Sequence, residues 1–353
     1  MQSGLTMNNS AVLIKTVRDK LKIGIALSEA EALTLAEFQG EEEEEEEEDG
    51  GSPNLFDLFA LANRIRAKIG DSVSLCSVLN AKSGKCPENC SFCAQSLHNG
   101  AKALTYPLQE PEDLLEAAKK AEKNGACRIG IVTSGNRLTD AELESVLEAV
   151  ELIKTETKLE VCASLGSLNP DRARKLKNAG LSRIHHNLET SDDFFGKICT
   201  THPYAERVRT VEIAKTAGLE VCSGGLIGPG ESRKARIKLA FALRTLDVDA
   251  VPLNILTPVP GTSLENAEPL EAMEILKTLA LFRLILPDKP IILAGGRERN
   301  LRDLQALALL CGANGLITGN YLTTEGQAPA RDLRMIRDVG LSVKINLQRY
   351  ELL

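Results

Sequence analysis

The sequence has no tryptophan, only four histidines and an aromatic content of 3%. So few histidines disfavour a zinc site, because zinc sites prefer two C-x2-C pairs or additional histidines, and no second ligand pair follows at that spacing. No apolar run approaches the roughly 20 residues that would span a bilayer. Glu29, Glu31 and Glu37 argue against an acid-poor transit peptide at the start, and no secretory signal is evident. We expect a cytoplasmic protein with no membrane partner.

One acidic segment dominates the charge of the chain. Residues 41–49 form an uninterrupted run of nine acids, and removing their charge from the net charge of −7 leaves +2. The nearly neutral remainder gives no reason to expect nucleic acid as a partner. A run of like charges repels itself and is typical of a solvated insert.

Residues 1–54 are expected to form an N-terminal helical extension that carries this acidic insert. Helical patterns cover residues 9–22 and 28–38, the second with an N-cap at Ser28. Residues 55–353 are expected to form one large domain, since single α/β barrels reach this size. A hydrophobic content of 43% is enough for its core.

From Asp71 onward the chain repeats an apolar run, a loop, an amphipathic helix and a glycine that ends the helix. The glycines interpreted as helix C-caps are Gly125, Gly180, Gly218, Gly312 and Gly340. Eight such units predict an α/β fold of the (β/α)8 TIM-barrel type. An open doubly wound sheet is the alternative, although no GxGxxG opens the first helix. The expected strands are residues 73–80, 128–133, 159–165, 182–188, 220–225, 250–256, 291–295 and 315–318.

The most informative motif is the C-x3-C-x2-C sequence of Cys86, Cys90 and Cys93. The chain has nine cysteines and no extracellular signal, which indicates a reducing compartment where thiols serve metals. Three thiolates on one short loop can hold a 4Fe-4S cluster and leave one iron open. An open iron can bind S-adenosyl-L-methionine and reduce its sulfonium, which releases a 5'-deoxyadenosyl radical. The motif follows the first expected strand, where barrel active sites lie, and predicts a radical enzyme.

Longer stretches resemble the biotin synthase family. They are, in family order, residues 82–96, 186–191, 221–225, 254–262 and 294–298. The resemblance covers roughly residues 55–342 and identifies Cys86, Cys90 and Cys93 as the ligands of the radical cluster. It implies the conversion of dethiobiotin to biotin: radicals remove hydrogen from two unactivated carbons, and a sulfur atom bridges them. It also implies a second, sacrificial iron-sulfur cluster as the sulfur source.

The resemblance further implies residues that contact S-adenosylmethionine. Phe92 takes the place of an aromatic near the adenine, and Glu189 replaces a family aspartate that contacts the ribose. Arg207 matches an arginine near the cofactor carboxylate, which a guanidinium fork suits. Gly224 and Gly225 would let the backbone approach the methionine amino group. Purely structural roles are the alternatives: Phe92 as a core aromatic, Arg207 as an exposed helix arginine, and Gly224 with Gly225 as a tight turn.

Asn187 and Asn254 match asparagines that hold the cyclic urea of the substrate. A ureido group offers two N–H donors and one carbonyl acceptor, which asparagine complements without adding charge. His185 replaces another family asparagine, and a neutral imidazole could supply the same donor. A core histidine is the alternative for that position.

The auxiliary cluster is where the chain departs from the better-known pattern of three cysteines and one arginine that holds a 2Fe-2S cluster. Cys162 and Cys222 match two of these cysteines, but Gly130 falls near the third and Ile292 aligns with the arginine. Cys76 lies on the first expected strand, and alternate barrel strands contribute the inward side chains of one layer. Cys76, Cys162 and Cys222 are therefore expected to hold a different auxiliary cluster, such as a four-iron one.

Other interpretations remain open from sequence. Buried cysteines are common as packing residues, and this is the expected role of Cys127 and Cys311, whereas Cys199 is kept as a reserve ligand. One alternative is another radical S-adenosylmethionine enzyme, of the hydrogenase-cofactor maturase or methylornithine-forming mutase type. Another is a non-catalytic iron-sulfur scaffold. The family resemblance implies a homodimer and an electron donor such as flavodoxin or ferredoxin.

Overall fold

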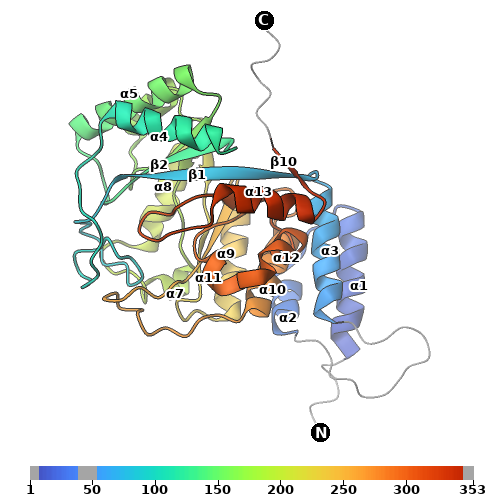
Figure 1. Cartoon of the computed structure of the whole chain (residues 1–353). Helices are drawn as coiled ribbons and strands as arrows, with labels where there is room; N and C mark the ends of the chain where they lie inside the picture. The colour runs from blue at the N-terminus through green and yellow to red at the C-terminus, as the bar shows by residue number, and fades with distance from the viewer. Residues whose placement is uncertain (1–7, 39–53, 345–353) are drawn as a thin grey trace, which may run out of the picture.

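The structure is a computed structural model that describes residues 8–38 and 54–344. The acidic run at residues 41–49 lies outside these described residues. Parallel strands form the centre, and helices surround it (Figure 1). The strands are β1 (Ser72–Lys82), β2 (Arg128–Thr133), β3 (Glu160–Ser164), β4 (Arg183–His185), β5 (Glu220–Cys222), β6 (Gly225–Ile227), β7 (Val251–Ile255), β8 (Ile291–Leu293), β9 (Gly315–Ile317) and β10 (Ser342–Val343).

The sheet closes on itself. Its hydrogen-bonded order is β5-β4-β3-β2-β1-β9-β8-β7-β6, and only Ser223 and Gly224 separate the two end strands along the chain. Ser223 N donates to Ala250 O at 2.9 Å, and Leu188 N donates to Gly224 O at 3.0 Å, so pairing continues on both sides of the break. With β5 and β6 counted as one interrupted strand, eight parallel strands form a barrel. The predicted (β/α)8 fold is confirmed, and the open doubly wound alternative is wrong.

The expected strand at residues 220–225 is the one that differs most. It is split at Ser223 and Gly224, and Gly224 packs so tightly there that a Cβ would lie 1.9 Å from Pro252 O. β10 pairs with the start of β1, outside the main order.

Helices follow the strands and cover the barrel. Each of the five predicted cap glycines follows a helix in the left-handed region, with φ between 76° and 135°, where glycine carries no Cβ penalty. The helices are α4 (Pro111–Lys123), α5 (Asp140–Glu156), α6 (Pro170–Asn178), α7 (Asp192–Phe195), α8 (Tyr204–Thr216), α9 (Arg233–Thr245), α10 (Ala272–Ile285), α11 (Arg297–Leu301), the 3-10 turn η1 (Arg302–Leu304), α12 (Gln305–Leu310) and α13 (Pro329–Asp338).

Three helices precede the barrel and pack on one side of it (Figure 1). They are α1 (Asn8–Lys22), α2 (Glu29–Glu37) and α3 (Leu55–Ala67). Ser28 and Glu31 form the capping box that starts α2, as the sequence predicts. Lys277 Nζ on α10 donates to the carbonyls of Ala36 and Phe38, at 2.8 and 3.1 Å, which fixes the end of α2 on the barrel. No helix among the described residues has the length and apolarity needed to cross a membrane.

Successive side chains of each strand point alternately outward, to the hydrophobic core under the helices, and inward, to the cavity of the barrel. On β2, Ile129 and Ile131 are fully buried in the hydrophobic core, whereas Arg128, Gly130 and Val132 line the inside of the barrel. The inward set therefore carries the residues available for chemistry.

Candidate functional site

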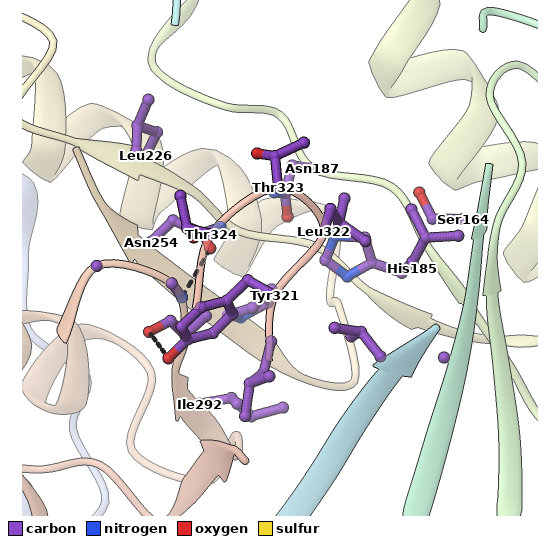
Figure 2. A pocket seen from close by; sticks show the side chains of 18 of the residues that line it. Ser164, His185, Asn187, Leu226, Asn254, Ile292, Tyr321, Leu322, Thr323 and Thr324 are labelled. Atoms are coloured by element: carbon purple, nitrogen blue, oxygen red, sulfur yellow. Dashed lines mark hydrogen bonds between the residues drawn. The ribbon is translucent and has the colours of Figure 1, made fainter. Parts of the chain in front are cut away.

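The barrel encloses a cavity of about 370 Å³. Figure 2 shows His185, Asn187, Asn254 and Tyr321 around it. Of the residues singled out from sequence, the cavity is lined by Cys76, Phe92, Cys93, Gly130, Cys162, His185, Asn187, Glu189, Cys222, Asn254 and Ile292. Cys86, Cys90, Arg207, Gly224 and Gly225 are not among its lining residues.

The C-x3-C-x2-C loop follows β1 and is fixed by backbone hydrogen bonds. Cys86 N donates to Gln95 O at 3.0 Å, and Cys93 N donates to Cys90 O at 3.1 Å. Asn99 Nδ2 donates to the carbonyls of Cys90 and Cys93, at 3.1 and 2.8 Å. The three thiols are all free, and Cys93 extends the loop into the cavity wall. A preformed loop of three free thiols has the donor chemistry of an iron-sulfur site.

Cys76, Cys162 and Cys222 lie on β1, β3 and β5, which are the first, third and fifth strands of the barrel, and all three line the cavity. Burial raises the pKa of Cys76 to about 12 and also raises the pKa values of Cys162 and Cys222. Free thiols in such a place stay protonated, and a bound metal would reverse this preference. Cys222 packs with Ala250 and Ile292, with Cys76 against the same cluster.

Two arginines that the sequence analysis did not single out line the same cavity. Arg128 is the register partner of Cys76, and Arg183 is the register partner of Cys162. Arg183 Nε donates to Glu220 Oε2 at 2.8 Å, and Arg128 NH1 donates to Ser182 Oγ at 2.9 Å. The sequence could have indicated Arg128, because it is two residues from Gly130 and side chains two residues apart on a strand face the same side.

Gly130 and Ile292 occupy inward positions of the barrel. A Cβ on Gly130 would meet no atom closer than 3.6 Å, so this part of the cavity has room for a side chain. Ile292 on β8 offers no ligand atom toward the neighbouring thiols of Cys76 and Cys222. The strands thus contribute three thiols and two guanidinium groups to the cavity wall, and the loop after β1 adds the thiol of Cys93.

The two asparagines are oriented by backbone groups on neighbouring strands. Asn187 Oδ1 accepts from Gly224 N and Asn254 Oδ1 accepts from Gly295 N, both at 3.1 Å. His185 is the register partner of Cys222. Burial, together with the charges of Arg207 and Arg183, lowers the pKa of His185 to about 4, so the ring is neutral at pH 7. Neutral polar groups of this kind suit a neutral, hydrogen-bonding ligand.

Glu189 and Arg207 meet beside the asparagine. Arg207 NH1 lies 3.7 Å from Glu189 Oε1 and donates to Asn187 O at 3.0 Å. Burial raises the pKa of Glu189, and the charge of Arg207 opposes that shift. Arg207 Nε is buried and has no hydrogen-bond partner among the described residues. An unpaired buried N–H is costly, so this group fits a ligand acceptor such as a carboxylate.

Gly224 and Gly225 have a packing reason to be glycine. A Cβ on Gly225 would lie 2.3 Å from Glu189 O, and Gly224 is equally tight against Pro252. Gly224 O already accepts from the backbone N of Leu188 and of Glu189, at 3.0 and 3.2 Å. Close strand packing accounts for this pair of glycines, and contact with the cofactor stays a prediction.

The loop after β9 closes one side of the cavity and was not predicted as part of the site. It contributes Tyr321, Leu322, Thr323 and Thr324 to the lining, as Figure 2 shows. Tyr321 Oη donates to Glu298 Oε1 at 2.9 Å, and Asn80 Nδ2 donates to Leu322 O at 2.8 Å. These bonds hold the loop against the β1 and β8 sides of the barrel. Nothing in its local sequence indicated this, because the contacts join residues far apart in the chain.

The remaining cysteines lie outside the cavity. Cys127 and Cys311 are buried, and Cys311 belongs to the main hydrophobic core. Cys199 packs beside Cys90, and hydrogen bonds from Cys90 and His202 lower the pKa of the Cys199 thiol.

Comparison with known proteins identifies this arrangement. The sequence matches the Radical SAM superfamily over residues 81–243 and the Biotin and Thiamin Synthesis associated domain over residues 252–342. It is 47% identical over 331 residues to a biotin synthase of Geotalea uraniireducens, covering 93% of this chain and 97% of that protein. A biotin synthase of Geotalea daltonii is 51% identical over 315 residues, covering 89% of this chain and 92% of that protein.

Solved structures share the fold at low identity. Methylornithine synthase superposes with a TM-score of 0.77 at 23% identity, covering 94% of this chain and 98% of that chain. A FeFe-hydrogenase maturase from Carboxydothermus hydrogenoformans has a TM-score of 0.76 at 20% identity, covering 95% of this chain and 80% of that chain. These likenesses show the barrel architecture, whereas the sequence relatives show the family. The chain belongs to the biotin synthase family of radical S-adenosylmethionine enzymes.

Proposed function

We propose that this chain converts dethiobiotin to biotin in the barrel cavity. The observation that carries the proposal is that candidate sulfur-cluster thiols and candidate urea-binding amides line one cavity. Cys93 of the C-x3-C-x2-C loop, here called the radical loop, lines the same cavity. Insertion of sulfur at two unactivated carbons requires the sulfur source, the substrate and the radical precursor to lie in contact.

The ligands proposed for a 4Fe-4S cluster are Cys86, Cys90 and Cys93. When bound, this cluster with S-adenosylmethionine supplies a 5'-deoxyadenosyl radical that abstracts hydrogen from the substrate. Phe92 provides an apolar wall for the adenine, and Glu189 accepts from the ribose hydroxyls. Arg207 would bind the cofactor carboxylate through its Nε–H, and the burial of this group without a partner supports that role.

The substrate-binding residues proposed are His185, Asn187 and Asn254. Each asparagine has its oxygen fixed by a backbone N–H. Asn187 Nδ2 donates to Glu189 Oε2 at 3.4 Å and Asn254 Nδ2 donates to Gly225 O at 3.5 Å, so each amide has a second N–H to offer a ligand in the cavity. His185 is neutral at pH 7 and can donate or accept one hydrogen bond. Together they can pair with the N–H and carbonyl groups of a cyclic urea without adding charge.

Cys76, Cys162 and Cys222 are proposed to hold the auxiliary iron-sulfur cluster that supplies sulfur. Three thiolates bring negative charge into a buried space, and Arg128 and Arg183 are placed to offset it. Because Ile292 offers no ligand where the better-known family pattern has arginine, a cluster other than that 2Fe-2S type is proposed, such as a four-iron one. We also propose a cytoplasmic homodimer that takes electrons from flavodoxin or ferredoxin.

The radical assignment is tested with alanine at Cys86, Cys90 and Cys93, singly and together. Each variant is reconstituted with iron and sulfide under anaerobic conditions, and 5'-deoxyadenosine is measured with and without dethiobiotin. We expect each substitution to abolish cofactor cleavage, because two thiolates cannot hold a cubane with one open iron. Cleavage by the triple variant would refute the assignment. If dethiobiotin fails to stimulate cleavage by the unmodified chain, the proposed substrate is wrong.

A further inference from the structure

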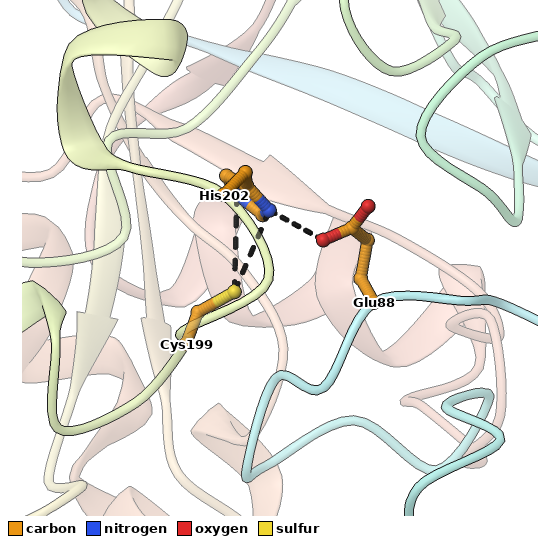
Figure 3. A group of neighbouring side chains, drawn as sticks. All are labelled: Glu88, Cys199 and His202. Atoms are coloured by element: carbon orange, nitrogen blue, oxygen red, sulfur yellow. Dashed lines mark hydrogen bonds and ion pairs between the residues drawn. The ribbon is translucent and has the colours of Figure 1, made fainter.

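A second group of metal-ligand side chains lies outside the barrel cavity. Glu88, Cys199 and His202 place one ligand atom each within 4.8 Å of the others (Figure 3). Glu88 comes from the radical loop, and the other two come from the loop between α7 and α8. Cys199 and His202 are buried, with 3% and 8% of their surface exposed.

We propose that Glu88, Cys199 and His202 form a site for one divalent transition-metal ion, and that Cys90 serves as its fourth ligand when the radical cluster is absent. The ligand set combines thiolate, imidazole and carboxylate, which suits zinc and ferrous ions. The claim that the ion and the cluster compete for Cys90 rests on the proposed function, which assigns Cys90 to the radical cluster. The rest of the proposal does not depend on that assignment.

The geometry is close to what a tetrahedral ion requires. Sulfur and nitrogen ligands about 2.3 and 2.0 Å from zinc are roughly 3.5 Å apart. Cys199 Sγ lies 3.5 Å from His202 Nδ1, so these two atoms already have that spacing. Glu88 Oε2 lies 2.5 Å from His202 Nδ1 and must move away by roughly 1 Å to share an ion with it. Glu88 can do so by rotating its side chain.

Cys90 lies beside Cys199 but is not one of the three residues whose ligand atoms all lie within 4.8 Å of one another, so its side chain must move to complete the site. Its side chain is hydrogen-bonded to that of Cys199, and the two residues pack in one small apolar cluster with Phe195 and Ile198. A site with Cys90, Cys199, His202 and Glu88 would have four protein ligands, as closed metal sites do. When a cubane is bound to Cys90, only three protein ligands remain for the divalent ion, so the ion would bind more weakly.

The two loops are also joined around this group, which holds the ligands in place. Asn89 Oδ1 accepts from the backbone N of Thr200 and of Thr201, at 2.9 and 3.2 Å. Ser91 N donates to Ile198 O at 2.9 Å. Thr201 Oγ1 also donates to Glu88. Such outer contacts orient metal ligands and strengthen binding.

The test uses the full-length chain with Cys76, Cys162 and Cys222 replaced by alanine, stripped of metal, under anaerobic and reducing conditions. Co²⁺ is the probe, because thiolate ligation and tetrahedral geometry give distinct absorption bands. We expect one Co²⁺ to bind, and to remain bound after the additional double substitution Cys86→Ala with Cys93→Ala. Cys199→Ser, His202→Gln and Glu88→Gln should each weaken binding at least about tenfold.

His98→Ala is the matched control, because His98 lies in the same loop and its ring hydrogen-bonds to Pro87 O, away from the proposed ligands. It should bind Co²⁺ as the parent does. Loss of binding on removal of Cys86 and Cys93, with no effect of His202→Gln and Glu88→Gln, would show that the radical loop alone binds the ion and would overturn the proposal. Thermal melting of each variant separates loss of ligand from loss of fold, and Glu88→Gln retains most contacts of the parent.

Competition with the cluster is tested in the same chain with alanine at Cys76, Cys162 and Cys222, so that no auxiliary cluster forms and no auxiliary thiol binds Co²⁺. Assembly of the 4Fe-4S cluster should release the Co²⁺, and retention of both would overturn the sharing of Cys90. A cubane that forms after Cys86, Cys90 and Cys93 are also replaced in this chain would instead refute the radical assignment and leave the Co²⁺ result standing. The identity of the ion is tested by binding ⁵⁷Fe²⁺ first and then assembling the cluster with natural iron. If ⁵⁷Fe appears in the Mössbauer spectrum of the cubane, the site delivers iron to the cluster. If bound zinc is not displaced by iron, the site holds zinc.

Discussion

Cys76 on β1 and Arg128 on β2 are register partners, and both side chains line the barrel cavity. The same relationship joins Cys162 to Arg183 on the next pair of strands. Side chains of register partners on parallel strands point to the same face. Each of these thiols therefore has a permanent positive charge nearby, in a space where a bare thiolate would be disfavoured.

We predict that Cys76→Ala loses auxiliary iron but keeps the radical cluster. The thiol is one of three inward ligands proposed, and two thiolates without an arginine ligand cannot hold the cluster. Iron and sulfide analysis with Mössbauer spectroscopy should show this loss, while 5'-deoxyadenosine is still produced and biotin is not. Cys311→Ala is the control, since burial likewise raises the pKa of Cys311 to about 12 but the residue lies outside the cavity. Normal biotin yield from Cys76→Ala would contradict the ligand assignment.

Removing one of the guanidinium groups should make the auxiliary cluster labile. We expect Arg183→Gln to lose auxiliary iron to a chelator about ten times faster, because the second shell of a metal site changes affinity on the order of 10-fold to 100-fold. The rate is followed by the decay of visible absorption. Arg172→Gln is the control, because Arg172 is ion-paired to Asp140 outside the cavity. Equal rates for the two variants would show that Arg183 serves only its ion pair with Glu220.

Asn254→Leu should weaken dethiobiotin binding at least about tenfold. Leaving buried polar groups of the ligand unpaired costs about 1–3 kcal/mol. Asn254→Asp is a closer substitution, because it keeps the acceptor for Gly295 N while removing the donor, and it should weaken binding in the same direction. Binding is measured by titration calorimetry, with Asn320→Ala as a control at an exposed position outside the cavity. Unchanged affinity in both Asn254 variants would remove this residue from the substrate site.

The lowered pKa of His185 should make the chain less stable in acid. Between pH 6.5 and about pH 4 the unfolded chain binds a proton at this histidine that the folded chain does not, so stability falls as the pH falls through that window. The contribution is at most about 3 kcal/mol, and less where the ring reaches water in the cavity. Urea unfolding of the cluster-free chain at pH 7 and pH 5 should show a smaller loss for His185→Asn. His186, whose pKa is lowered chiefly by burial, is retained in both proteins, so most of its contribution cancels in the difference. Identical losses would place the acid sensitivity elsewhere.

The barrel could be predicted from local patterns because they act over short distances. Gly125, Gly180 and Gly218 end helices wherever the chain must enter the left-handed region, and the apolar runs after them become strands. The radical loop was equally readable, because Cys86, Cys90 and Cys93 are close in sequence. Three cysteines at this spacing can bind one iron-sulfur cluster whatever the position of the loop in the fold.

Contacts between distant segments were decided by the tertiary structure. Arg128 and Arg183 begin ordinary strands in the sequence, and only the register of the closed barrel brings them beside Cys76 and Cys162. His202 is 114 residues from Glu88, and the loop between α7 and α8 must fold over the radical loop before the two meet. The sequence by itself determined the periodicity, the caps and the thiol motif, since these depend on neighbouring residues. Strand register and loop docking determined which distant side chains share one space, because those contacts form only when the sheet has closed.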